Sequence, residues 1–195
     1  MSQTFSSICV YCGSNAGGRP SYTAAAKDLG AYLAKRGIRL IYGGGDVGLM
    51  GILANAALDN GGEVVGVIPE KLLQLEVGHR GLTELHVVKD MHERKAKMAE
   101  LADAFIAMPG GFGTLEETFE VTTWSQLNYH LKPVGLLNVD AYYDQLISFV
   151  EHAIKEGFVR DVHADLIKHA EDPESLIALL ETSEVARIED WIEPA

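Results

Sequence analysis

The sequence predicts a single α/β domain in which a doubly wound parallel sheet carries helices on both faces. Three observations predict this class. Short apolar runs rich in β-branched residues alternate with longer stretches of helical periodicity along the chain. The chain has 195 residues, of which 47% are hydrophobic, which is enough for one buried core. Two glycine-rich segments stand between an apolar run and a helical pattern, as in the strand-to-helix turns of such sheets.

The elements follow in order from these periodicities. We expect strands near residues 6–12, 38–42, 63–68, 85–88, 103–108 and 133–138, and helices near 20–36, 48–60, 91–101, 114–127, 141–156 and 173–181. Gly37 and Gly61 suit helix C-termini, where a left-handed backbone is needed. Residues 70–84 form the longest connection without a clear period, so they are a candidate active-site loop. Residues 1–183 are expected to form the domain and 184–195 an acidic C-terminal tail.

Composition and motif searches exclude several classes of function. The formal net charge of −12 argues against a nucleic-acid partner, because binding a phosphate backbone needs clustered Lys and Arg. No apolar run approaches the roughly 20 residues of a membrane-spanning helix, and the N-terminus shows no secretory signal. We therefore expect a cytoplasmic protein without a membrane partner. The His residues show no paired metal spacing and no G-x-S-x-G is present, so neither a bound metal nor a serine nucleophile is expected.

Cys9 and Cys12 form a C-x-x-C inside the first apolar run. A redox C-x-x-C would instead open a helix. Side chains three residues apart on a strand point to opposite faces of the sheet. We therefore expect two buried thiols and no thioredoxin-like chemistry.

The first glycine-rich segment follows the predicted strand 38–42. Gly43, Gly45 and Gly48 match G-x-G-x-x-G in the strand-turn-helix context that gives this motif its meaning. Such a turn lets the backbone approach a phosphate or sugar and points a helix N-terminus at negative charge. The alternative is that these glycines and Gly44 only satisfy the geometry of a tight turn.

The second glycine-rich segment, residues 109–114, lies between the predicted strand 103–108 and the helix 114–127. Thr114 is placed as an N-cap, and residues 114–117 match a capping box in which Glu117 reaches back to the cap. From the residues alone, Glu117 is therefore either a cap or a catalytic carboxylate.

Three carboxylates, those of Glu116, Glu117 and Glu120, crowd the first turns of this helix. The helix dipole offsets part of their repulsion, and a cationic neighbour would offset more. Arg94 and Lys95 open the preceding helix and could supply that neighbour. Opposed Arg and Glu side chains at adjacent strand ends would make a catalytic pair, although a solvated face is the default expectation for both cations.

These motifs together resemble the LONELY GUY (LOG) family, the cytokinin riboside 5′-monophosphate phosphoribohydrolases. The P-G-G-x-G-T-x-x-E motif is complete at residues 109–117, and Met91-His92-Glu93-Arg94-Lys95 precedes it. The resemblance also covers residues 12–14, 42–45, 48–51, 66–69, 123–127 and 132–138, so that it spans about three quarters of the chain.

The resemblance implies a Rossmann-like homodimer that binds a nucleoside monophosphate across both glycine loops and uses no cofactor. By the family pattern, Arg94 and Glu117 are the catalytic pair. The positions that would bind the nucleotide are Ser14, Gly43, Gly44, Gly45, Glu76, Lys95, Gly110, Gly111, Phe112, Gly113, Thr114, Glu116 and Thr123. Phe112 occupies a variable position of the motif, and residues 74–80 depart from the plant-like pattern, which leaves the specificity for the base substituent open.

The implied reaction hydrolyses the N-glycosidic bond of an adenine or prenylated adenine nucleoside 5′-monophosphate to free base and ribose 5-phosphate. Cleavage passes through an oxocarbenium-like sugar. We expect Glu117 to stabilise this cation and to activate or orient the attacking water. Arg94 would position the nucleotide and hold Glu117 ionised. Backbone N–H groups of the glycine loops would hold the 5′-phosphate.

Three alternatives stand beside this hypothesis. A nucleotide-binding carrier or sensor would bind AMP without turnover. A nicotinamide-dependent oxidoreductase would use the first glycine loop with Glu70 as ribose ligand, but it would lack a second domain for a hydride acceptor. Members of the family are often labelled lysine decarboxylases, yet decarboxylation needs an electron sink such as pyridoxal phosphate, and no motif places an aspartate partner beside Lys95 or Lys97.

Overall fold

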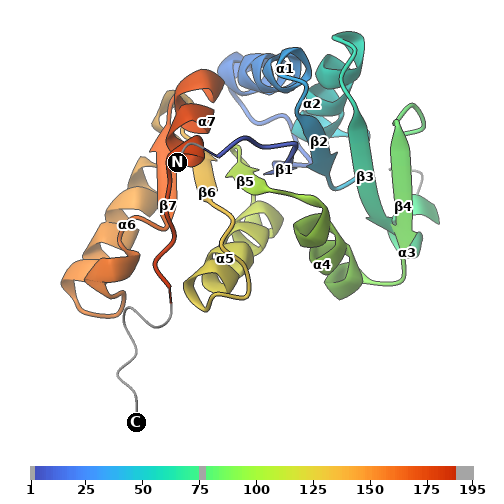
Figure 1. Ribbon diagram of the computed structural model, residues 1–195. Coiled ribbons are helices and arrows are strands. Elements are labelled where there is room, and N and C mark those ends of the chain that lie inside the picture. Colours follow the sequence, from blue (N-terminus) through green and yellow to red (C-terminus); the bar gives the residue numbers. More distant parts are fainter. Residues whose placement is uncertain (1–2, 75–77, 188–195) are drawn as a thin grey trace.

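A computed structural model describes residues 3–74 and 78–187, which contain one seven-stranded parallel sheet (Figure 1). The strand order is β4-β3-β2-β1-β5-β6-β7, so the order reverses between β1 and β5. The strands are β1 (Ser7–Tyr11), β2 (Arg39–Tyr42), β3 (Val64–Pro69), β4 (Glu84–Val88), β5 (Ala104–Ala107), β6 (Val134–Leu137) and β7 (Ile167–Ala170). This topology confirms the predicted doubly wound α/β fold.

Helices cover both faces of the sheet (Figure 1). One face carries α1 (Pro20–Lys35), α2 (Gly48–Asp59) and α7 (Pro173–Glu181), and the other carries α4 (Met91–Leu101), α5 (Phe112–Gln126) and α6 (Asp144–Lys155). The short α3 (Glu70–Gln74) and two 3-10 turns, η1 (Val139–Ala141) and η2 (Asp161–His163), complete the described elements. No helix among them is long and apolar enough to cross a membrane.

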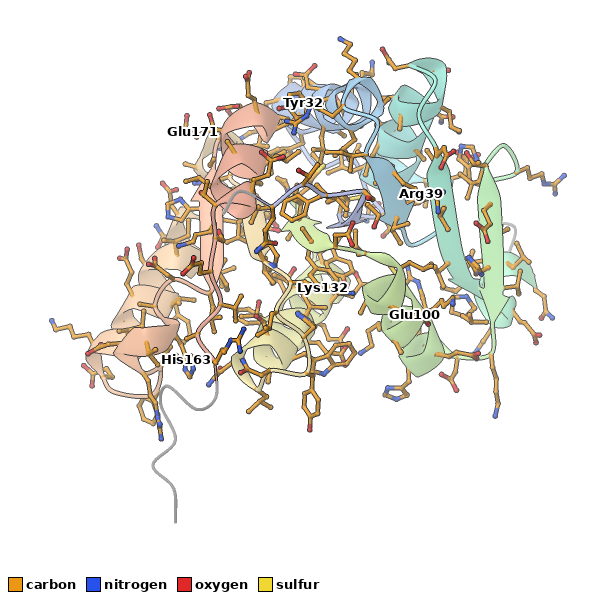
Figure 2. The ribbon with its side chains drawn as sticks, in the orientation of Figure 1. Tyr32, Arg39, Glu100, Lys132, His163 and Glu171 are labelled. Atoms are coloured by element: carbon orange, nitrogen blue, oxygen red, sulfur yellow. The ribbon has the colours of Figure 1, made fainter. Side chains whose placement is uncertain are left out.

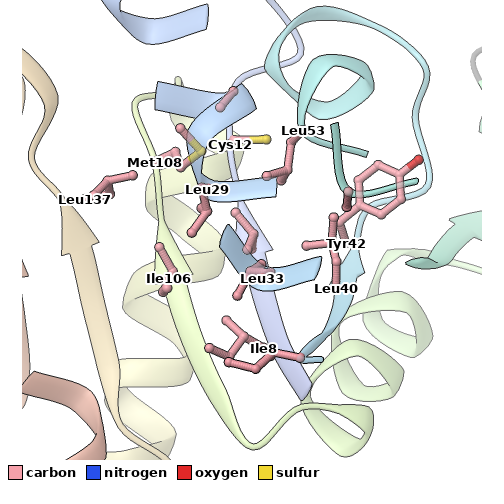
Figure 3. Packing of buried hydrophobic residues seen from close by; sticks show 14 of the residues in the cluster. Ile8, Cys12, Leu29, Leu33, Leu40, Tyr42, Leu53, Ile106, Met108 and Leu137 are labelled. Atoms are coloured by element: carbon pink, nitrogen blue, oxygen red, sulfur yellow. The ribbon is translucent and has the colours of Figure 1, made fainter. Parts of the chain in front are cut away.

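The side chains of β1 alternate between the two helical layers. Ile8 and Val10 belong to the core beneath α1 and α2, where Leu29 and Leu53 pack against the sheet (Figure 3). Cys9 lies in the core on the other face, beside Met98 of α4. This period-two alternation, together with the central position of β1, explains why residues 8–12 carry no charged or strongly polar side chain.

The two cysteines are free and buried, as expected, and they belong to different cores. Cys9 packs beneath α4 and α5, whereas Cys12, just after β1, packs on the α1 and α2 side. Burial raises the pKa of both thiols, because a thiolate would lose its hydration there.

The capping box predicted at Thr114 is wrong. Helix α5 begins at Phe112, and its N-cap is Gly111, which has an extended backbone and no side chain to donate or accept. Thr114 therefore lies buried within the first turn, where its carbonyl accepts a hydrogen bond from the Thr118 hydroxyl at 2.6 Å. Glu117 has no capping partner in this arrangement, which removes the structural explanation for its presence.

Three further boundaries differ from expectation. The segment 70–84 contains the single-turn helix α3, and β7 occupies a sheet edge where no strand was predicted. Helix α6 begins at Asp144 instead of residue 141, because Asp140 and Ala141 have left-handed backbone conformations, with φ of 51° and 59°. A helix cannot extend through such residues.

Candidate active site

A cleft of about 560 Å³ opens at the carboxyl ends of β1, β2 and β5. These ends flank the point where the strand order reverses, which is where ligands bind in open α/β sheets. The walls come from residues 12–17, 43–50 and 109–117, with further side chains from α1, α3, α4 and the segment after β6. Both glycine-rich loops therefore line one cleft.

Arg94 is buried at the base of this cleft and is held by main-chain carbonyls. Its Nε donates to the Val67 carbonyl at 3.1 Å, and its Nη2 donates to the Gly43 carbonyl at 3.2 Å. These two acceptors lie in β3 and directly after β2. Two anchored donors fix the plane of the guanidinium, so the direction of the remaining Nη1 is set by the sheet.

That Nη1 lies 3.3 Å from Oε1 of Glu117, and both side chains are almost fully buried. The structure thus brings the predicted catalytic pair together. Burial raises the pKa of Glu117 above its ordinary value, and the favourable charge of Arg94 offsets this only in part. Arg94 favours the ionised form of Glu117, as expected. Burial favours the protonated form, and its effect on the pKa is the larger of the two.

Lys95 joins α4 to α5 through two carboxylates. Its Nζ contacts the carboxylates of Glu116 and, at 3.0 Å, Glu120. Burial by itself would lower the pKa of Lys95, but the two carboxylates raise it overall. Lys95 is not among the side chains that line the cleft, whereas Glu116 is. The default expectation of a solvated face for Arg94 and Lys95 is wrong, because both are more than nine-tenths buried.

Glycines of the first loop are closely surrounded by protein. A Cβ atom on Gly43 would lie 1.9 Å from Nη2 of Arg94, and one on Gly48 would lie 2.3 Å from the Ser14 carbonyl carbon. Gly44 has a left-handed φ of 74° and its carbonyl accepts the His79 amide at 2.9 Å. Gly43 and Gly45 line the cleft, whereas Gly44 does not.

The second loop leaves open space instead. A Cβ atom on Gly111 or Gly113 would meet no atom within 4 Å, although one on Gly110 would clash with Thr114. Phe112 is 94% exposed at the mouth of the cleft. Loop residues 110–114 all line the cleft, so this is where a ligand can approach the backbone most closely.

Ser14 also lines the cleft, whereas three of the predicted binding residues, Gly44, Lys95 and Thr123, do not. Thr123 is exposed on α5, donates to the Phe119 carbonyl at 2.7 Å, and lines a separate groove of about 360 Å³ between α5 and α6. Glu76 lies outside the described residues.

Several cleft residues were not predicted from the sequence. Met50, Ile68, Leu72 and Met91 form an apolar part of the wall, and Tyr22 and Tyr142 also line the cleft. The four apolar side chains belong to no motif that predicts a binding site. Tyr142 could have been suspected only because it closely follows the predicted strand 133–138. Among the described residues, no three His, Cys, Asp or Glu side chains gather in a way that could hold a metal ion.

This combination of features defines a class of protein. A doubly wound sheet, a cleft at the point where its strand order reverses, and two glycine loops leading into helix N-termini are typical of α/β proteins that bind nucleotides.

Comparison with known sequences gives the family. Residues 50–180 match the family model described as "Possible lysine decarboxylase". The chain is 52% identical to cytokinin riboside 5′-monophosphate phosphoribohydrolase LOG of Oryza sativa subsp. japonica, over 91% of this chain and 73% of the relative. It is 51% identical to LOG7 of Arabidopsis thaliana, over 92% of this chain and 83% of that one. The chain therefore belongs to the LOG family, as its motifs indicated.

Solved structures share the fold. The molybdenum cofactor binding protein from Rippkaea orientalis is 25% identical, with a TM-score of 0.70 over 93% of this chain and 98% of that one. The molybdenum cofactor carrier protein from Chlamydomonas reinhardtii is 22% identical, with a TM-score of 0.68 over 90% and 95%. The second likeness concerns the fold alone.

Proposed function

We propose that this protein hydrolyses the N-glycosidic bond of a purine nucleoside 5′-monophosphate, as an AMP nucleosidase-like phosphoribohydrolase of cytokinin biosynthesis. The observation that carries the proposal is the buried pair of Arg94 and Glu117, whose side chains lie 3.3 Å apart at the base of the cleft. Relatives about 50% identical over most of their length are named for this reaction. They support assigning it to this chain.

In the proposed reaction the bond between the sugar C1′ and the base nitrogen breaks, and its electron pair leaves with the base. Ionised Glu117 faces the positive charge that develops on the sugar and stabilises it. A water molecule adds its oxygen to C1′ and gives a proton to Glu117, the base takes up one proton from the solvent, and Glu117 returns its proton to the solvent before the next turnover. The raised pKa makes ionised Glu117 a stronger base toward that proton than an exposed glutamate would be.

The two remaining parts of the substrate match different parts of the cleft. Amides of residues 110–114, at the start of α5, would hold the 5′-phosphate, because a helix N-terminus and open glycines favour an anion. The apolar wall formed by Met50, Ile68, Leu72 and Met91 would contact the base and any prenyl group on it.

The deciding experiment incubates the purified protein with AMP and with its isopentenyl derivative, without added metal or cofactor. Chromatography should show the free base and ribose 5-phosphate. Glu117→Gln serves as the matched control and should release the base about 100-fold more slowly, or more slowly still. If both nucleotides also persist with the native protein after long incubation, the proposal is wrong.

A carrier without turnover is the alternative favoured by a specific observation, the 25% identity and shared fold with a molybdenum cofactor binding protein. Binding of AMP without base release would support it. The nicotinamide alternative is disfavoured, since Glu70 is exposed and does not line the cleft.

Lysine decarboxylation, the activity in the description of the family model, finds little support in the residues. A lysine that forms a Schiff base with pyridoxal phosphate must present a free, readily deprotonated amine. Lys95 instead contacts two carboxylates, which raise its pKa, and Lys97 pairs with Glu100 at 3.0 Å.

We further propose that the protein is a homodimer that forms through α5 and α6. Helix α6 has no fully buried residue although it is strongly amphipathic, and Phe149 on it is 63% exposed. The groove beside it includes Thr123, so a second copy seated there would bring this predicted binding residue into an interface. Phe149→Glu should convert a dimer to a monomer in analytical ultracentrifugation. A monomeric native protein would contradict the proposal.

The cytoplasmic location expected from the sequence stays a prediction.

A further inference from the structure

Two consecutive tyrosines after β6 hold the backbone of the second glycine loop. The Tyr143 hydroxyl donates to the Met108 carbonyl at 2.6 Å, and the Tyr142 hydroxyl donates to the Gly110 carbonyl at 2.5 Å. Tyr143 is buried, whereas Tyr142 is 40% exposed and lines the cleft. The two hydroxyls therefore hold the carbonyls of Met108 and Gly110, two residues that follow β5.

The carbonyl between these two is also held. Pro109 accepts a hydrogen bond from the Gly13 amide, which follows β1, at 3.1 Å. Three successive carbonyls therefore have partners outside the loop, contributed by the segments after β1 and β6. This arrangement leaves the loop little freedom to rotate its peptide planes.

The direction of a carbonyl fixes the direction of the next amide. In a trans peptide the C=O and N–H bonds point in opposite directions. The Tyr142 hydroxyl, by binding the Gly110 carbonyl, therefore points the Gly111 N–H away from Tyr142. Within the described residues, no group accepts a hydrogen bond from the Gly111 amide, and Gly111 lines the cleft. An unpaired amide in a cleft is a donor ready for an anion.

The segment that carries Tyr142 is held in a strained conformation. Asp140 and Ala141 have φ of 51° and 59°, a region that L-residues with a side chain rarely adopt. Asn138 holds the turn closed, since its Oδ1 accepts the Tyr143 amide at 2.7 Å and its Nδ2 donates to Asp144 at 2.8 Å. Such strain persists only where the surroundings over-determine it, and it is frequent at functional sites.

We propose that Tyr142 is a positioning residue for phosphate recognition: its hydroxyl orients the peptide between Gly110 and Gly111 so that the Gly111 amide donates to a sugar phosphate in the cleft. Tyr142 does not need to touch the ligand, because its proton is already donated to Gly110. Tyr22 packs edge-on against its ring, with centroids 5.7 Å apart. The identity of the ligand rests on the proposed function, whereas the orientation of the peptide does not.

The test compares Tyr142→Phe with the native protein by calorimetric binding of two unreactive probes. Ribose 5-phosphate carries the phosphate, and adenosine lacks it. Loss of one hydrogen bond that orients a phosphate-binding amide should weaken ribose 5-phosphate binding about 10-fold and leave adenosine binding unchanged. Equal weakening of both probes, or of neither, would overturn the inference.

The control variant is Tyr32→Phe. Tyr32 lies on α1 at the outer surface (Figure 2), and its hydroxyl accepts a hydrogen bond from Arg36 at 2.9 Å. The variant removes the same atom from a hydrogen-bonded tyrosine that does not line the cleft. It should bind both probes like the native protein.

A second measurement requires no ligand. In nitrogen-15 NMR spectra of the ligand-free protein, Tyr142→Phe should shift the Gly111 amide resonance, and Tyr32→Phe should not. An unchanged Gly111 resonance overturns the inference even if the protein hydrolyses AMP. Conversely, native protein that binds ribose 5-phosphate but never cleaves AMP would refute the proposed function alone. Native protein that does not bind ribose 5-phosphate would overturn the phosphate role of Tyr142.

Discussion

The two glycine-rich loops have similar sequences and the same strand-to-helix context, yet their glycines are surrounded differently. In the first loop, a side chain on Gly43 or Gly48 would collide with Arg94 or with the backbone at Ser14. In the second loop, Gly111 and Gly113 face open space in the cleft. Gly43 and Gly48 therefore admit protein atoms, as Gly110 does for Thr114, whereas Gly111 and Gly113 leave room for a ligand.

This difference shows that one sequence signature has two physical causes. A glycine motif after a strand indicates that something approaches the backbone closely. It does not indicate whether that neighbour is a ligand or a side chain such as Arg94. The buried pair of Arg94 and Glu117 connects the two cases, since the first loop anchors its cation and the helix after the second loop carries its anion.

The largest effect on turnover is expected from breaking the pair of Arg94 and Glu117. Glu117→Gln removes the charge but keeps the size and an acceptor oxygen, so turnover of AMP should fall about 100-fold or more. The free energy of unfolding should change by less than about 2 kcal/mol, because Arg94 keeps both of its carbonyl partners. Steady-state kinetics and thermal denaturation measure the two effects. Near-normal turnover would move the catalytic carboxylate elsewhere, with Glu116 the next candidate.

Arg94→Lys tests the other half of the pair. Lysine keeps the charge but loses the planar fork that reaches two carbonyls and a carboxylate at once. Turnover should fall about as far as in Glu117→Gln. Full activity of this variant would show that only the charge matters.

The comparison between the loops is tested by adding one methyl group to each. Gly43→Ala places a Cβ against the Arg94 guanidinium, so it should destabilise the fold by about 1–3 kcal/mol and lower turnover. Gly113→Ala meets no atom within 4 Å and improves helix propensity, so the fold should be as stable as before or gain up to about 1 kcal/mol. Only binding of ribose 5-phosphate should suffer in the second variant. Similar melting temperatures for the two variants would refute the distinction.

A smaller effect concerns pH. Because the pKa of Glu117 is raised by burial, the acid limb of kcat/KM should lie above the ordinary value of 4.5 for a glutamic acid. The folded state also holds this proton more tightly than the unfolded state. The contribution of Glu117 to stability is therefore present below its ordinary pKa and is lost as pH rises through the raised value. A pH-rate profile and melting curves over the same range check both statements, and Glu117→Gln should remove the stability trend.

The smallest effect concerns a position where the backbone favours glycine but the chain has another residue. Ala141 has φ of 59°, so Ala141→Gly should relieve strain and stabilise the fold by about 1 kcal/mol. Chemical denaturation measures this. Lys132→Met should have the opposite effect on stability. The Lys132 ammonium (Figure 2) donates to the Ala99 carbonyl near the end of α4 at 2.6 Å, and loss of this hydrogen bond should destabilise the fold. A destabilised Ala141→Gly would show that the turn is not strained.

The centre of the sheet could be predicted from the sequence because β1, β3, β5 and β6 are buried along their whole length and almost entirely apolar. Strand β7 was missed because it lies at the sheet edge, is only half-buried and contains Lys168 and His169, so it has no apolar run. The start of α5 was misplaced because Thr114 and Glu117 satisfy a capping pattern that Gly111 makes unnecessary. Local patterns predict elements well where burial is uniform and poorly where several residues could serve as the cap.

The candidate site was predictable to a similar extent. Arg94 follows β4 at one edge of the sheet and Glu117 follows β5, with β3, β2 and β1 between them, so the expected adjacency of their strand ends is wrong. The two side chains meet because Arg94 reaches back to the carbonyls of Val67 and Gly43. The contact of Tyr142 with Gly110 spans 32 residues and depends on a turn with left-handed residues, for which no local signal exists. Thr123 was assigned from the family motif, and its position in a separate groove shows that such an assignment does not fix where a side chain lies.

The sulfur atoms near the cleft have a consequence for handling and for cell chemistry. Cys12 lines the cleft and Cys9 lies beneath it, and burial raises the pKa of both thiols, so both stay protonated at neutral pH. Peroxide and alkylating reagents attack the thiolate and not the thiol. The two cysteines should therefore stay reduced without a reducing agent, so that any loss of activity on treatment with peroxide is expected to come from Met50 or Met91 in the cleft wall.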